Sequence, residues 1–185
     1  MKKPLLAGLI LLLMLLLVPP AQASTIVWGM NASNNGSEMI EAFNLDTGAK
    51  VDGFLVPRDN LNGRGIAVVG TTIYYSNSSE GKVFITDSVS HADMGVAFDT
   101  CNIPQIGCLN GIATIAWDGT DLWITGYNGS NNAYKVKPNG SWDGTVVGFG
   151  NGRDGFEVAN NHLVANRGDG VGPYDLYDLN GNLIT

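Results

Sequence analysis

Short apolar runs alternate with turn-forming residues along the chain from about residue 25 onward. The runs are four to seven residues long, are rich in Val, Ile, Thr, Tyr, Phe and Trp, and are bounded by Gly, Asn, Asp and Ser. Examples are TIVWGM, GIAVVG, TIYYSN, KVFITD, DLWITG and NAYKVK. No stretch offers a convincing helical period over eleven or more residues. The pattern predicts an all-β protein made of antiparallel meanders.

One hairpin occurs three times in this pattern. IAVVGTTIYYS, which begins at Ile66, aligns without a gap with IAWDGTDLWIT, which begins at Ile115, at an offset of 49 residues (66 to 115). A third copy, FEVANNHLVAN, begins at Phe156 at an offset of 41 (115 to 156). Each hairpin is followed by a third strand, and four strands in about 40–50 residues is the repeat of a β-propeller blade.

The repeats predict one propeller domain over residues 24–185, in units of approximately 24–60, 61–109, 110–152 and 153–185. The first unit lacks its innermost strand, and GNLIT at the end begins a fourth strand. This makes about three and a half to four blades, so we expect an incomplete propeller. Its open strand edges would be covered by missing C-terminal blades or by dimerisation. A sandwich of about twelve strands is the alternative architecture.

Residues 1–23 are predicted to be a signal peptide. MKK is basic, Leu5 to Val18 is an unbroken apolar run of fourteen residues, and Ala21 and Ala23 place small residues ahead of Ser24. A membrane-spanning helix is the alternative, but it needs roughly 17–25 residues. We therefore expect a secreted protein, extracellular or periplasmic, with no membrane span after cleavage between Ala23 and Ser24.

The chain is acidic, with a net charge of −7. Without Lys2 and Lys3, eight basic residues (10 − 2) face seventeen acidic ones, which gives −9 (8 − 17). Nucleic acids and anionic membranes would repel such a surface. The charge therefore excludes nucleic-acid binding as the expected function.

The two cysteines, Cys101 and Cys108, lie in the loop CNIPQIGC. In an exported protein, two nearby thiols of this kind most simply form a disulfide. A structural zinc site is the alternative, but it needs about four ligands. The loop also accounts for the eight-residue difference between the repeat offsets (49 − 41). We interpret this loop as an insertion between blades that the disulfide closes.

DGTDLWITG followed by NAYKVKPNG resembles the repeats of bacterial secreted β-propellers of the NHL, YVTN and SMP-30/gluconolactonase-like group. The signal peptide together with DTGAKVDGF also resembles propeller proteins that carry a C-terminal PEP-CTERM sorting tail. The resemblance covers essentially the whole mature chain. It implies an exported propeller and is weakly specific for function.

The lactonase branch of this group implies a divalent cation, often Ca²⁺, at the mouth of the central channel. The matching ligands here are Asn62, Asn110 and Asp154, and Ca²⁺ favours such oxygen ligands. The alternative is that these Asn-Gly and Asp-Gly pairs are tight turns. The Glu that the family carries in its first blade has no clear counterpart here. No other cofactor is expected.

Other candidates for chemistry are few. Glu157 faces either the channel or a neighbouring blade, where Arg153 or Arg167 would pair with it. His91 and His162 lie in a loop and a turn, and the spacing of Ser, His and Asp builds no hydrolase triad.

The aromatic residues of the hairpins have two interpretations. Tyr74, Trp117, Trp123 and Tyr134 are most simply blade-packing groups. Stacking on a carbohydrate is the alternative for one that is left exposed.

These observations favour an exported binding or surface module over an enzyme. Its ligand would be a protein, a carbohydrate or a small molecule, and a propeller scaffold by itself implies no activity. The first alternative is a Ca²⁺-dependent lactonase-like hydrolase. The second is a structural protein of the cell surface or matrix.

The leader generates a first prediction. When the full chain is expressed in a bacterium with a general secretory pathway, the exported protein should begin at Ser24, because Ala21 and Ala23 meet the small-residue requirement of signal peptidase. Intact-mass spectrometry of the exported fraction measures this. A membrane-bound product that retains Met1 would contradict it.

Overall fold

The computed structural model describes residues 25–31, 39–56, 62–127, 131–149, 155–166 and 174–185. Within these ranges the chain forms fourteen strands in four antiparallel sheets and one short 3-10 turn, Thr100–Asn102. No described helix is long and apolar enough to cross a membrane. The prediction of an all-β fold is confirmed.

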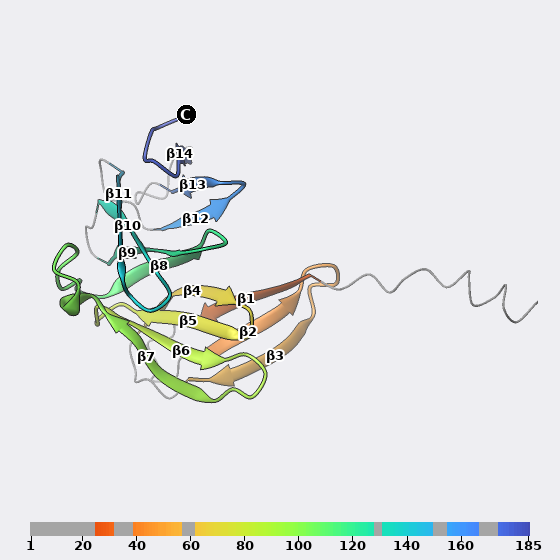
Figure 1. Ribbon diagram of the computed structural model, residues 1–185. Coiled ribbons are helices and arrows are strands. Elements are labelled where there is room, and N and C mark those ends of the chain that lie inside the picture. Colours follow the sequence, from red (N-terminus) through yellow and green to blue (C-terminus); the bar gives the residue numbers. More distant parts are fainter. Residues whose placement is uncertain (1–24, 32–38, 57–61, 128–130, 150–154, 167–173) are drawn as a thin grey trace, which may run out of the picture.

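Each sheet is a meander in which strands consecutive in the sequence are neighbours (Figure 1). The first blade contains β1 (Ile26–Asn31), β2 (Met39–Asn44) and β3 (Lys50–Leu55). The second contains β4 (Gly63–Val69), β5 (Thr72–Asn77), β6 (Lys82–Asp87) and β7 (Asp93–Asp99). The third contains β8 (Ile112–Trp117), β9 (Leu122–Gly126), β10 (Asn132–Val136) and β11 (Trp142–Gly148). The fourth contains β12 (Phe156–Ala159), β13 (His162–Ala165) and β14 (Asp175–Asp178).

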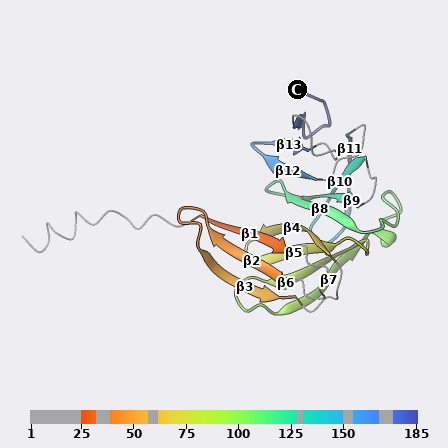
Figure 2. The same cartoon turned by 180° about the vertical axis from the view of Figure 1, so that it is seen from behind.

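The four blades are arranged as an arc around their innermost strands. Strand β4 lies against β8, and β8 lies against β12. The first and fourth blades are at opposite ends of the stack in both views (Figures 1 and 2). Within the described residues the ring is therefore open, which is the incomplete propeller that the repeats predict.

An apolar cluster fills each junction between blades. The first junction buries Ile40 against Ile73, Tyr75 and Phe84. The second is centred on residues such as Ile112, Ile115 and Leu122, and the third on Trp123, Phe156 and Leu163. Because each sheet alternates its side chains between two faces, a blade inside the arc contributes to two clusters. The first and fourth blades each contribute to only one.

A repeated turn identifies equivalent strands. The side-chain Oδ1 of Asn44, Asp87 and Asp178 accepts backbone N–H groups from the residues that follow, at 2.7–3.1 Å. These turns follow β2, β6 and β14, so the three strands hold the third position of their blades. Strand β1 therefore holds the second position, and it packs against β4 as β5 packs against β8. In the described part of the chain, the first blade lacks its innermost strand.

The disulfide between Cys101 and Cys108 closes the connection from β7 to β8. Asp99 starts this loop by accepting the Cys101 N–H at 2.9 Å, and Ile103 is buried beneath it. A cross-link across a loop restricts the unfolded chain and stabilises the fold. The predicted disulfide is confirmed.

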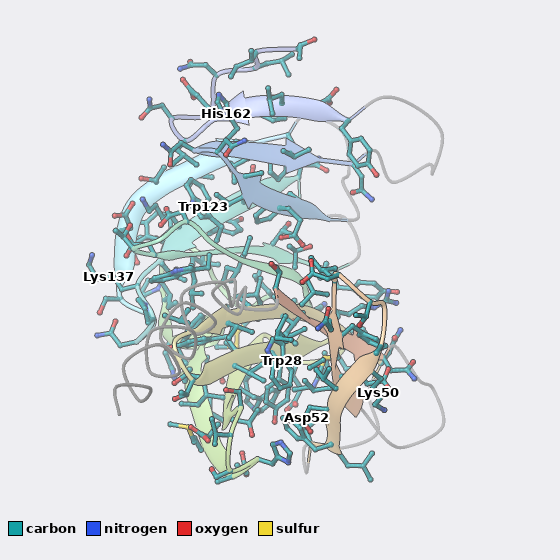
Figure 3. The ribbon with its side chains drawn as sticks, turned by 90° about the vertical axis from the view of Figure 1, so that its right-hand side faces the viewer. Trp28, Lys50, Asp52, Trp123, Lys137 and His162 are labelled. Atoms are coloured by element: carbon teal, nitrogen blue, oxygen red, sulfur yellow. A yellow bond between two sulfur atoms is a disulfide. The ribbon has the colours of Figure 1, made fainter. Side chains whose placement is uncertain are left out.

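The carboxylate of Asp118 holds the β8–β9 hairpin to the next strand. Its Oδ1 accepts the backbone N–H groups of Thr120 (2.9 Å) and Asp121 (2.8 Å). Its Oδ2 accepts Nε1 of Trp123 at 2.9 Å and lies 3.0 Å from Nζ of Lys135, on β10. The Trp123 residue is fully buried (Figure 3). One buried carboxylate thus accepts hydrogen bonds from the backbone of the turn and from an indole, and pairs with an ammonium group.

These contacts govern the ionisation of Asp118. Burial alone would raise its pKa, but the N–H groups of Asp121 and Thr120, the Lys135 ammonium and the Trp123 indole together hold the pKa well below its usual range. Since the pKa is lower in the folded than in the unfolded state, the resulting stabilisation is present above the unfolded pKa of about 3.9 and is lost as the pH falls below it.

We therefore expect Asp118→Ala to lower the free energy of unfolding by about 3 kcal/mol at pH 7, because it leaves the Lys135 charge and the Trp123 N–H unpaired. Urea denaturation at pH 7 measures this loss. The variant should also lose less stability than the wild type between pH 5 and pH 3. Asp46→Ala, which changes an exposed turn residue, is the control and should stay within about 0.5 kcal/mol of the wild type. An equal effect of both changes would contradict this role for Asp118.

Candidate functional site

The predicted metal ligands lie where innermost strands begin. Asn62 directly precedes β4, and Asn110 lies two residues before β8. Both strand starts meet the same loop: the Ser78 N–H donates to the Asn62 carbonyl at 3.0 Å, and a Cβ on Gly111 would lie 2.3 Å from the Ser78 backbone. The fold thus brings the neighbourhoods of Asn62 and Asn110 together. Asp154 lies outside the described residues.

The two asparagines differ in environment. Oδ1 of Asn62 is buried and has no hydrogen-bond partner among the described residues, whereas Asn110 is exposed. Arg64 is two residues further on, at most about 7 Å along the backbone, and its guanidinium donates to the Tyr127 hydroxyl at 2.9 Å. A permanent positive charge at this position opposes a divalent cation. In the described part of the chain, no three His, Cys, Asp or Glu side chains gather as a metal site.

A pocket of about 260 Å³ lies where β8, β12 and β13 come together. Gly155 is part of its lining: its N–H donates to Oδ1 of Asn166 at 2.7 Å, while the Asn166 N–H donates to the Gly155 carbonyl at 3.1 Å. A Cβ on Gly155 would lie 3.2 Å from Oγ1 of Thr114. Glycine therefore keeps this part of the pocket open. The lining includes Thr114, Gly155, Glu157, Val164, Asn166 and Tyr174.

Glu157 is the acidic group of this pocket. It lies on β12 opposite Val164 of β13. Partial desolvation by the neighbouring protein raises the pKa of Glu157, although the residue as a whole is exposed to solvent. No described residue donates a hydrogen bond to it or forms an ion pair with it. Arg153 and Arg167, the partners that the sequence suggested, lie outside the described residues.

The repeat alignment shows which face Glu157 occupies. At the offsets of 49 and 41, its equivalents are Ala67 and Ala116 (67 to 116 to 157). Ala67 is buried in the junction with the third blade and Ala116 in the junction with the fourth. Glu157 therefore lies on the face that would meet a following blade. The alignment already places Ala67, Ala116 and Glu157 at one equivalent position of the repeat. Only the structure shows that side chains at this position face the neighbouring blade.

The remaining candidates have structural contacts. Nε2 of His91 lies 3.0 Å from Oδ2 of Asp52, and its ring stacks on Phe54 at a centroid distance of 4.0 Å, so it links the first and second blades. Nδ1 of His162 lies 2.7 Å from the Asn160 carbonyl within its own turn. Neither histidine forms part of a described hydrolase triad.

The aromatic residues pack the blades, as expected. Tyr74 and Trp123 are buried, and Trp117 and Tyr134 are partly buried against the cluster between the second and third blades. The carboxylate of Asp121 lies 3.5 Å from Nζ of Lys135 and 3.5 Å from Nζ of Lys137. Both carboxylates of WDGTD are thus engaged in pairs that hold the blade together.

Comparisons with known proteins place the fold. No family model and no curated protein sequence matches the chain. A Myxococcus xanthus glutaminyl cyclase is similar in structure, with a TM-score of 0.55, 9% identity, and coverage of 78% of this chain and 68% of that one. A nidogen/laminin complex has a TM-score of 0.53 and 14% identity, over 88% of this chain and 75% of that one. The WD40 domain of Neurospora crassa Pan2 has a TM-score of 0.50 and 9% identity, over 90% of this chain and 51% of that one.

These similarities show a β-propeller-like fold. At such low identities they carry nothing about activity. The chain spans about half to three quarters of the length of these structures.

Proposed function

We propose that the protein is an exported β-propeller module that binds a partner and is not an enzyme. The observation that carries this proposal is the pocket where β8, β12 and β13 come together, in which the carboxyl group of Glu157 lies at a position that the second and third blades use for packing. A single acidic group with apolar neighbours suits recognition. A hydrolase would also need a nucleophile or an activated water.

Export is supported by two features. The leader ends in Ala21-Gln22-Ala23, and the Cys101–Cys108 disulfide suits an oxidising compartment. We infer a mature domain over residues 24–185, in the extracellular space or the periplasm. The specific kinship with NHL, YVTN, SMP-30-like or PEP-CTERM propellers rests on the repeat motifs alone. The nidogen/laminin complex offers a precedent for a propeller-like fold in a protein complex.

The end faces of the arc support association. On the first blade, Val27, Val51 and Leu55 are 44%, 52% and 59% exposed. Trp28 and Phe54, which alternate with them, pack against the second blade instead. The Glu41–Lys50 ion pair lies on the same sheet. A sheet face with exposed apolar side chains of this kind is normally covered in a propeller by a neighbouring blade. We propose that further blades or a second copy of the chain cover it.

Self-association generates a testable prediction. If a second copy covers the first blade, light scattering after gel filtration should show a concentration-dependent dimer, and Leu55→Asp should shift it to monomer because a buried carboxylate is costly. Val89→Asp is the matched control, because Val89 is 76% exposed in the β6–β7 turn. A wild type that is monomeric at every concentration would exclude a second copy and leave further blades as the cover.

A Ca²⁺-dependent lactonase-like hydrolase is the second candidate. The observation that favours it is the buried Oδ1 of Asn62, which has no partner among the described residues, since such an oxygen is available to a cation. Asn110 and Asp154 would supply further oxygen ligands. The positive charge of Arg64 argues against this candidate.

Calcium separates the two candidates. A ligand that binds only the folded state at 100 times its Kd stabilises by about 2.7 kcal/mol, which raises Tm by several degrees. The binding-module proposal predicts no Tm change between EDTA and millimolar Ca²⁺, and no hydrolysis of glucono-δ-lactone above background. A Ca²⁺-dependent rise in Tm that Asn62→Ala abolishes, together with lactone hydrolysis, would establish the second candidate and overturn the first.

A further inference from the structure

The column that contains Ala67, Ala116 and Glu157 distinguishes the fourth blade from the two before it. The two alanines are 8% and 2% exposed because the next blade packs on them. An ionised carboxyl group in the same place would lose its water and would need a partner of opposite charge. A surface that packs on Glu157 must therefore differ in chemistry from the blades that pack on Ala67 and Ala116.

Apolar side chains lie beside Glu157, next to the polar groups of Thr114 and Asn166 in the pocket. Val164 pairs with Glu157 across the sheet, and Leu176 of β14 pairs with Val164 on the same face. Beyond them, Ile184 is 51% exposed, and its N–H donates to the Leu176 carbonyl. Tyr174, at the rim of the pocket, is 68% exposed. One carboxyl group is thus framed by aliphatic and aromatic groups.

A cationic head on an apolar stem matches this arrangement. Arginine and lysine side chains bury their methylene groups against apolar surface while the charged end reaches a polar partner. Guanidinium groups form charge-assisted hydrogen bonds with carboxylates and also stack on aromatic rings. Thr114 adds a hydroxyl oxygen to the lining. The net charge of −7 attracts a basic partner over a longer range.

We propose that the outward face of the fourth blade docks a protein segment that inserts an arginine or lysine side chain into the Glu157 pocket. The segment itself lies over Val164, Leu176 and Ile184. This inference rests on the proposed binding function and specifies the chemistry of the partner.

The pocket can be tested with defined probes. The acetylated, amidated tripeptide Ala-Arg-Ala is titrated into the ¹⁵N-labelled chain and compared with the same peptide carrying citrulline, which keeps the shape of arginine but has no charge. We expect amide shifts at Glu157, Val164 and Asn166 with the arginine peptide and at least roughly tenfold weaker binding of the citrulline peptide. Equal binding of the two peptides, or no binding of either, would overturn the proposal.

Two variants and a control locate the interaction. Glu157→Gln keeps the shape of the side chain and should weaken the arginine peptide at least roughly tenfold. Gly155→Ala places a methyl group next to Thr114 in the pocket and should weaken binding of the arginine peptide without any change of charge. Asp46→Asn removes the same unit of charge from an exposed turn and should leave binding unchanged. If Asp46→Asn weakens binding as much as Glu157→Gln, the peptide is attracted only by the overall charge of the protein, and the assignment of the binding site to the Glu157 pocket is wrong.

A free guanidine tests whether the partner is a protein segment. n-Butylguanidinium carries the same single charge and an alkyl stem without a peptide backbone, and we expect it to bind several-fold more weakly than the tripeptide. Equal affinity would show that the surface over Val164 and Leu176 contributes nothing, which overturns a protein partner.

The stability of the variant without ligand excludes an internal role. We expect Glu157→Gln to leave Tm unchanged or slightly raised, because it removes a partly desolvated carboxyl group. A Tm several degrees lower would show that Glu157 pairs within the chain, with Arg153 or Arg167, and would overturn the proposal. Each of these failures overturns a basic protein segment as the ligand of the pocket, whereas the secretion, Ca²⁺ and lactone tests decide the proposed function by separate measurements.

Discussion

Adjacent blades approach each other at their innermost strands more closely than a side chain permits, and the arc depends on this approach. A Cβ on Gly65 would lie 2.6 Å from the Ile115 nitrogen. Ser76 joins the same two blades: its Oγ accepts the Gly65 N–H at 2.9 Å and donates to the Ile112 carbonyl at 3.0 Å. With glycine at the contact and a hydroxyl bridge beside it, the sheets come close enough to bury the apolar cluster between them.

The same constraint produces the surfaces that remain. A blade is stable when both faces are covered, so an open arc leaves one uncovered face on the first blade and one on the fourth. The first face exposes Val27, Val51 and Leu55, which suits a further blade or a second copy. The fourth face carries Glu157 where the second and third blades carry alanine, so a further blade cannot pack on it in the way that blades pack on those alanines. The proposed binding function follows from this difference between two ends of one repeating structure.

Most polar residues of the repeats serve the turns. The N–H and hydroxyl groups of Ser90 and the N–H of Val89 lower the pKa of Asp87 to about 2, and Asn44 and Asp178 hold equivalent turns. Asp118 and Asp121, which look like an acidic pair in the sequence, are bound to Lys135 and Lys137. Carboxylates that turns and neighbouring strands already engage are poor candidates for catalysis, whereas Glu157 lies in a pocket without a hydrogen bond or an ion pair to any described residue.

Local patterns in the sequence determined the strands, the hairpin repeat, the propeller-like blades and the Cys101–Cys108 disulfide, because alternation, turn chemistry and short loops act between residues close in the chain. The tertiary structure decided which polar groups are engaged. It paired Asp118 with Lys135, buried Oδ1 of Asn62 while leaving Asn110 exposed, and assembled the Glu157 pocket from β8, β12 and β13. Burial and charge pairing depend on residues far apart in the sequence, and one chain without its fold does not show which of them meet.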